Sequence, residues 1–110
     1  MNKRDTLILS AAVRCFPLWL RKSHRKSISV NIDPATLKLS QDLQQSLANW
    51  SAQWESRYQV DDQKDIYRED SEKWENFKQK GRRILKQLEK EVGEKYEITC
   101  NEDQVKINHN

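Results

Sequence analysis

"LSQDLQQSLANWSAQWESRY", residues 39–58, has the clearest periodic pattern of apolar residues in the sequence. An apolar or aromatic side chain returns every three or four residues along it, and polar side chains fill the positions between. The stripe consists of Leu43, Leu47, Trp50, Trp54 and Tyr58. This spacing places all of them on one helix face, so the stretch predicts an amphipathic helix over 39–58. Ser40 is the expected N-cap, because its hydroxyl can accept a hydrogen bond from a first-turn N–H.

A second apolar stripe follows within residues 71–92. Its members recur at the same spacing: Trp74, Phe77, Gly81, Ile84, Leu85, Leu88 and Val92. Glycine costs about 1 kcal/mol against alanine in a helix, so Gly81 on the stripe indicates a close approach by another backbone. Ser71 is the expected N-cap, and Gly93 stands where a left-handed C-cap is expected. Residues 71–92 therefore predict a second amphipathic helix.

Short stretches outside the helices predict strands. Residues 6–13 are apolar and rich in β-formers, which favours a strand buried on both faces, while a helix ended by Pro17 is the competing interpretation. Residues 27–32 alternate, which places these aliphatic side chains on one side of a strand: Ile28, Val30 and Ile32. Residues 95–100 also alternate, and residues 105–108 could return as an edge strand.

These elements predict an α+β fold. Two glycines and two prolines leave few sharp turns, which favours long helices over a many-stranded barrel. We expect a small β-sheet covered by two amphipathic helices, at about 39–58 and 71–92. Residues 1–110 should form a single domain with a frayed C-terminal tail at about 108–110. The tryptophans on the helix stripes belong to its core: Trp50, Trp54 and Trp74.

The charge of the chain is unevenly distributed. The net charge is +3, and charged residues make up 34% of the sequence. Residues 1–50 hold eight Lys and Arg against three Asp and Glu, whereas residues 51–110 hold twelve against fourteen. A strongly basic nucleic-acid binder usually carries a larger and less divided excess, so the totals do not favour that class.

The N-terminal sequence imitates a secretion signal poorly. Asp5 separates the basic residues from the apolar run, Arg14 ends that run after eight residues, and no small-residue cleavage site follows. Residues 6–20 are too short to span a bilayer, so we expect a cytoplasmic protein without a membrane anchor. Cys15 and Cys100 are then expected to be thiols rather than a disulfide.

Catalytic and metal-binding patterns are weak in this sequence. His24 and His109 have no second ligand at metal-binding spacing, so no metal and no cofactor are expected. A thiol–imidazole pair of Cys15 and His24 rests on nothing but their presence. The carboxylates lie among Lys and Arg at helix spacing, as surface ion pairs do. We therefore expect a protein that is not an enzyme.

A basic segment follows Trp19. Arg21, Lys22, Arg25 and Lys26 could bind phosphates, with the tryptophan as a stacking partner for a base. The alternative is a solvated loop that keeps a strand edge from pairing. No motif for specific nucleic-acid readout supports the first interpretation.

An acidic segment lies between the two helices. Residues 61–72 have a net charge of −4 and contain Tyr67. The predicted partner-binding residues are these: Asp61, Asp62, Asp65, Tyr67, Glu69 and Asp70. Carboxylates around an aromatic anchor suit docking on a basic surface, such as the substrate cleft of a nuclease. The alternative is a soluble loop between the helices.

Three motifs resemble a group of short bacterial proteins. They are "CFPLWL" at 15–20, "NIDPATLKLSQDLQQSLANW" at 31–50, and "GRRILKQLEKEVG" at 81–93 before a strand. The resemblance covers roughly residues 10–100, and proteins of this kind are similar to the immunity partners of bacterial toxins from contact-dependent or related competition systems. It implies that residues 15–20 are core and that residues 21–26 are a solvated loop. The basic 21–26 stretch and the extension after Cys100 depart from the pattern.

The sequence thus favours a non-enzymatic binding module. The leading hypothesis is an immunity protein that binds a toxin domain, such as a nuclease, through residues 61–70 and thereby neutralises it. The alternative is a nucleic-acid-associated regulator that uses residues 21–26.

Overall fold

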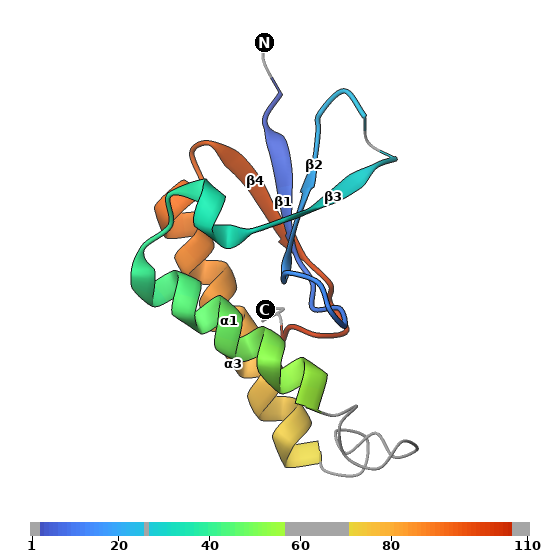
Figure 1. Cartoon of the computed structure of the whole chain (residues 1–110), viewed down its shortest axis with the longest axis vertical. Helices are drawn as coiled ribbons and strands as arrows, with labels where there is room; N and C mark the ends of the chain where they lie inside the picture. The colour runs from blue at the N-terminus through green and yellow to red at the C-terminus, as the bar shows by residue number, and fades with distance from the viewer. Residues whose placement is uncertain (1–2, 26, 57–70, 107–110) are drawn as a thin grey trace.

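The computed structural model describes residues 3–25, 27–56 and 71–106, and these form a four-stranded sheet with helices on one side of it (Figure 1). In chain order, the elements are β1 (Asp5–Leu9), β2 (Leu18–Arg21), β3 (Ser29–Ile32), the 3-10 helix η1 (Pro34–Leu37), α1 (Gln41–Ser56), α3 (Ser71–Val92) and β4 (Tyr96–Cys100). The predicted α+β class is confirmed. The second predicted helix has the expected bounds, and the first is found from Gln41 to the last described residue before the gap, Ser56.

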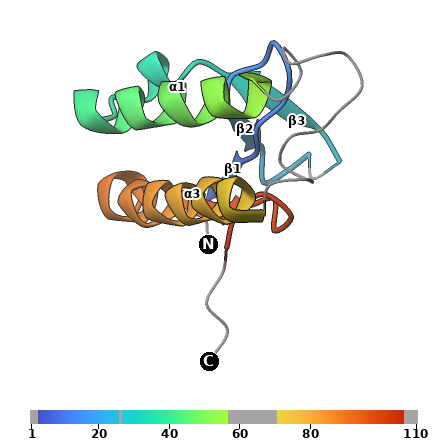
Figure 2. The ribbon, with the colours of Figure 1, turned by 90° about the horizontal axis from the view of Figure 1, so that it is seen from below.

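The sheet is mixed, with the strand order β3-β2-β1-β4. β1 pairs antiparallel with β2 and parallel with β4, and β2 pairs antiparallel with β3. A parallel neighbour needs a long crossover, and the helices provide it between β3 and β4. α1 and α3 run antiparallel and side by side (Figure 2).

The core lies between the helix pair and one face of the sheet. Leu7, Leu9 and Leu18 are fully buried there, while Ile8 and Trp19, which point to the other face, are half-buried. In the helix layer, Trp50 stacks on Phe77 with ring centroids 4.6 Å apart, and its indole N–H donates to the Phe77 carbonyl at 3.0 Å. Trp54 and Trp74 pack around the same ring, so the predicted core role of the stripe tryptophans is confirmed.

Several predicted strands needed correction. The strand expected over 6–13 ends at Leu9 and is not buried on both faces, because helices cover only one face. β2 was not predicted, since residues 15–20 were expected as core without a strand, and Phe16 is 46% exposed. Ile28 and Val30 are 49% and 56% exposed rather than core-facing. They lie toward the β2–β3 turn, where the helices no longer cover the sheet (Figure 1).

The segment after β4 belongs to the core and is not an edge strand in its described part, residues 101–106. Val105 is 1% exposed, and a Cβ placed on Gly81 would lie 3.0 Å from its Cγ2 and 3.1 Å from Trp50. Gly81 does lie at a close contact, but the prediction of an approaching backbone is wrong, because side chains make the contact. Gln104 is also buried, and its amide bonds both the N–H and the C=O of Ala11, at 2.7 and 2.9 Å.

The two helices are tied together at one end by a shared cap. The Ser40 hydroxyl accepts from the Leu43 N–H at 3.1 Å, which confirms the predicted N-cap. The Glu91 carboxylate of α3 accepts from both the N–H and the hydroxyl of Ser40, at 2.7 and 2.6 Å. The left-handed cap expected at Gly93 is wrong: its φ is not positive, and its N–H continues the helix by bonding the Glu89 carbonyl.

Candidate partner-binding surfaces

The predicted acidic surface lies outside the described residues. This holds for all six of its members: Asp61, Asp62, Asp65, Tyr67, Glu69 and Asp70. The structure does place the two ends that carry this segment. The described end of α1 and the start of α3 lie at the same end of the helix pair (Figure 1).

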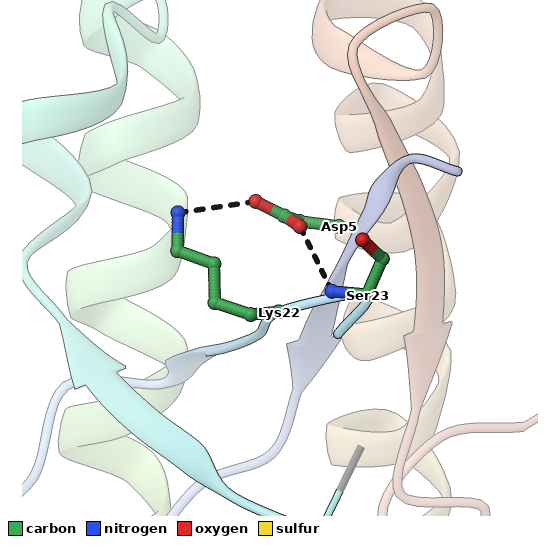
Figure 3. Close-up of polar contacts among 3 residues, drawn as sticks. All are labelled: Asp5, Lys22 and Ser23. Atoms are coloured by element: carbon green, nitrogen blue, oxygen red, sulfur yellow. Dashed lines mark hydrogen bonds and ion pairs between the residues drawn. The ribbon is translucent and has the colours of Figure 1, made fainter. Parts of the chain in front are cut away.

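The basic segment is partly neutralised by Asp5. The Asp5 carboxylate accepts from the Ser23 N–H at 3.0 Å and from the Lys22 ammonium at 3.2 Å (Figure 3). The Ser23 bond first, and then Lys22, hold the pKa of Asp5 below its ordinary value. Arg21 ends β2, Arg25 is exposed in the following turn, and Lys26 lies outside the described residues.

A hollow of about 580 Å³ lies beside this contact. Its lining is Lys3, Arg4, Thr6, Arg21, Lys22, Ser23 and Glu97. Lys22 is held by Asp5, and Arg4 donates to the Gly93 carbonyl, so two of its four cations already have partners. Trp19 shares a sheet face with Arg21, but its indole N–H is bonded to the Ser10 carbonyl at 3.0 Å. Asp5 and Glu97 therefore offset part of the positive charge of this hollow.

The middle of α3 carries a basic run that the charge count by halves did not single out. Residues 78–86 contain five Lys and Arg and no acidic residue. Lys78 pairs with Glu75, which also holds Lys106. Lys80, Arg83 and Lys86 are exposed and make no ion pair within the described part of the chain. The signal was present in the sequence, but the periodicity assigned these residues to an ordinary solvated helix face.

Two of these cations border a groove between the helices, of about 320 Å³. Its lining is Ser46, Asn49, Trp50 and Gln53 from α1, and Lys80, Arg83, Ile84 and Gln87 from α3. Trp50 and Ile84 are buried and form an apolar floor, while Asn49, Lys80 and Arg83 are exposed. The groove thus offers hydrogen-bond donors and positive charge above a floor shielded from water, an arrangement that suits anionic groups.

Glu91 marks the end of the groove region on α3. Partial burial raises its pKa, but the hydrogen bonds from Ser40 and Gln87 outweigh that effect and leave the pKa below its ordinary value. Because its two oxygens accept three hydrogen bonds, this carboxylate is committed to holding the helices together.

Both cysteines are free thiols and half-buried. Burial, followed by the nearby Glu102, raises the pKa of the Cys100 thiol, which disfavours the reactive thiolate. Among the residues described, no three potential ligands cluster as a metal site would require. Neither α1 nor α3, as far as they are described, offers a stretch long and apolar enough to cross a bilayer.

Comparison with known proteins places this fold in a family. The model of the Serratia CdiI immunity protein-like family matches residues 5–103, which include every strand and both long helices. A search of the curated proteins gave no match. The matched span covers nearly the whole chain, and it includes the groove, the first part of the segment after β4 and the core apart from Gln104 and Val105. The chain therefore belongs to the Serratia CdiI immunity protein-like family.

Proposed function

We propose that this protein is a cytoplasmic immunity protein that neutralises a cognate toxin domain by binding it, without catalysis. The family match over residues 5–103 carries this proposal, because it spans the described strands and both long helices rather than a local motif. The described residues add support: the thiol of Cys100 is disfavoured as a nucleophile, and the strongest polar contacts are structural. Contact-dependent competition between bacteria is the proposed setting.

The experiment that tests this proposal uses a toxin domain identified by co-purification with the tagged protein or by inspection of the genes next to its own. Purified toxin is titrated with the protein while toxin activity and complex size are measured. Inhibition that is complete at an equimolar ratio, with a stable complex in size-exclusion chromatography, is the expected result. An enzyme acting on the toxin would reach full inactivation far below one equivalent, and absence of a complex would remove the proposal.

We further propose that the acidic residues between the helices contact the toxin and that a basic toxin surface, such as a nuclease cleft, receives them. The net charge of −4 over residues 61–72 supports this, with Tyr67 as the anchor. Reversal of Asp61, Asp62 and Asp65 to lysine should slow association roughly tenfold and weaken protection. Glu69→Lys and Asp70→Lys should act in the same direction. Unchanged association of the triple variant would place the interface elsewhere.

A nucleic-acid-associated role through the basic segment is the second candidate. The hollow lined by Arg21 and Lys22 favours it, and Arg25 and Lys26 would extend the surface. This role predicts binding to a short nucleic-acid duplex that collapses between low and moderate salt. Retention of that binding after Arg21, Lys22, Arg25 and Lys26 are changed to glutamine would exclude the segment.

A further inference from the structure

We infer that the groove between α1 and α3 is a second contact site of this protein, and that it takes one or two carboxylates from the surface of the toxin. This inference rests on the proposed function. It names a surface distinct from the acidic segment and assigns the chemistry of the group that fills it.

The two cations that border the groove are not neutralised by acidic side chains of the described residues. Lys80 and Arg83 stand one turn apart on α3 and lack an ion-pair partner within the residues described. Like charges at this spacing destabilise an isolated helix. An anion held between them removes that repulsion, so this part of α3 is better suited to a bound state than to isolation.

Several carboxylates on the two helices that could have neutralised this pair are bonded to other groups. On α3, Glu91 is held by Ser40 and Gln87, and Glu75 is held by Lys78 and Lys106. On α1, Glu55 accepts from the Arg14 N–H at 2.6 Å. The structure thus uses these acidic groups elsewhere and leaves the groove positive.

The side chains that line the groove are suited to binding a carboxylate. The guanidinium of Arg83 can hold a carboxylate by two parallel hydrogen bonds, and Lys80 adds a compact positive charge beside it. The opposite wall offers the Asn49 amide and the Ser46 hydroxyl as further donors. The buried floor of Trp50 and Ile84 can receive the methylene groups of an Asp or Glu side chain.

The distribution of charge along α3 favours a protein over a nucleic acid as the partner that fills the groove. Exposed acidic residues stand on both sides of the positive stretch along α3: Glu72 before it and Glu89 after it. A phosphate backbone carries charge continuously, so an extended polyanion laid along this helix would meet repulsion on either side of the groove. A folded protein can place one or two carboxylates in the groove and keep its other charges away.

The test uses the full-length protein and the purified toxin domain identified as described under the proposed function. Lys80→Glu with Arg83→Glu reverses the groove, and we expect its affinity for the toxin in calorimetry to fall roughly 30-fold or more. Lys38→Glu with Lys95→Glu is the matched control, because it changes the net charge equally at exposed positions outside the groove. The control should lose less than about 3-fold. Equal losses in the two variants would show a general charge effect and overturn the inference.

A second measurement reports the bound group directly. A carbodiimide joins an amine to a carboxylate in contact with it and adds no spacer, so the complex should give a cross-link between Lys80 and a toxin Asp or Glu. Lys80→Arg keeps the charge and should abolish that product, as mass spectrometry would show. A complex that forms normally without a Lys80 cross-link removes the inference and leaves the proposed function intact. A wild-type protein that does not bind the toxin removes both.

Discussion

The buried amide of Gln104 makes a prediction that tests how the chain closes its core. Gln104 is 3% exposed, and Ala11, beyond the end of β1, is 4% exposed. The Gln104 side chain accepts from the Ala11 N–H at 2.7 Å and donates to the Ala11 C=O at 2.9 Å. It therefore replaces the neighbouring strand that Ala11 lacks, and it does so across a sequence separation of 93 residues.

Gln104→Leu replaces the amide with an apolar side chain of similar size and leaves the N–H and the C=O of Ala11 without these partners. A buried backbone group left unpaired costs about 1 to 3 kcal/mol. The apolar surface of leucine offsets part of that cost, so we expect a net loss of about 2 to 4 kcal/mol in the free energy of unfolding. At roughly 4 to 8 °C per kcal/mol for a domain of this size, the melting temperature should fall by tens of degrees at the upper end.

Gln104→Glu separates hydrogen bonding from size. The carboxylate can accept from the Ala11 N–H but repels the Ala11 carbonyl, whereas the protonated acid can make both bonds. Burial and that repulsion should raise the pKa of the new group in the folded state above its unfolded value of about 4.3. The variant should therefore approach the wild-type stability at low pH and lose stability as the pH rises above the unfolded pKa.

Urea unfolding of the wild type and both variants, at matched pH values from neutral to acidic, measures these differences. Gln45 provides the control, because it is exposed on α1 and bonds only Asn49 within the described residues. Gln45→Leu and Gln45→Glu should change stability by less than about 0.5 kcal/mol. If Gln104→Leu loses less than about 1 kcal/mol, the Ala11 groups find other partners and the reasoning is refuted.

Three further predictions follow from the helix layer. Glu91→Gln should cost about 1 kcal/mol at neutral pH; because the folded-state pKa of Glu91 is lowered, its contribution is present above the unfolded pKa and should vanish in urea titrations as the pH falls through the folded value. Gly93→Ala should lower the thermal midpoint, since the new Cβ would lie 2.3 Å from the Glu89 carbonyl oxygen. Gly81→Ala should destabilise the protein less, because the contacting side chains can shift and the higher helix propensity of alanine contributes about 1 kcal/mol of stability. Trp50→Phe removes the indole bond to Phe77 and part of the ring, and should cost about 2 kcal/mol in chemical unfolding; a loss equal to that of an exposed substitution would contradict it.

How much of the fold was predictable depended on the range of the signal. The helices were predicted well, because an apolar stripe records which face of a helix is covered, and 71–92 was found with the expected bounds. The sheet was predicted less well. Alternation at 27–32 shows that side chains divide between two faces, but it does not show that a helix reaches them, and Ile28 and Val30 remain exposed.

The long-range polar contacts could not be predicted from local sequence. Gln104 and Ala11 meet because β4 lies parallel to β1, and neither residue has a local pattern that indicates this. Glu91 and Ser40 meet because the helices are antiparallel, and only the capping serine could be identified in advance. Local patterns specify the elements, whereas these partners are fixed by the topology.

The candidate surfaces show the same difference for charge. In the sequence, the excess of positive charge lies in residues 1–50, and the basic segment after Trp19 is its most prominent part. In the structure, Asp5 holds Lys22, and Arg4 is bonded to the Gly93 carbonyl. α3, in the half whose total charge is negative, carries further positive charge that is not paired within the described residues, at Lys80, Arg83 and Lys86.

A count of charged residues in the sequence does not show which of those charges remain after internal pairing. What a partner meets is the charge left after internal pairing, and on α3 that charge lies beside a groove with hydrogen-bond donors and an apolar floor. If the acidic segment and this groove both contact the toxin, the toxin must present charges of both signs at matching positions. Such an interface rejects unrelated partners more strongly than a surface of one sign, because a mismatch at either site leaves like charges together.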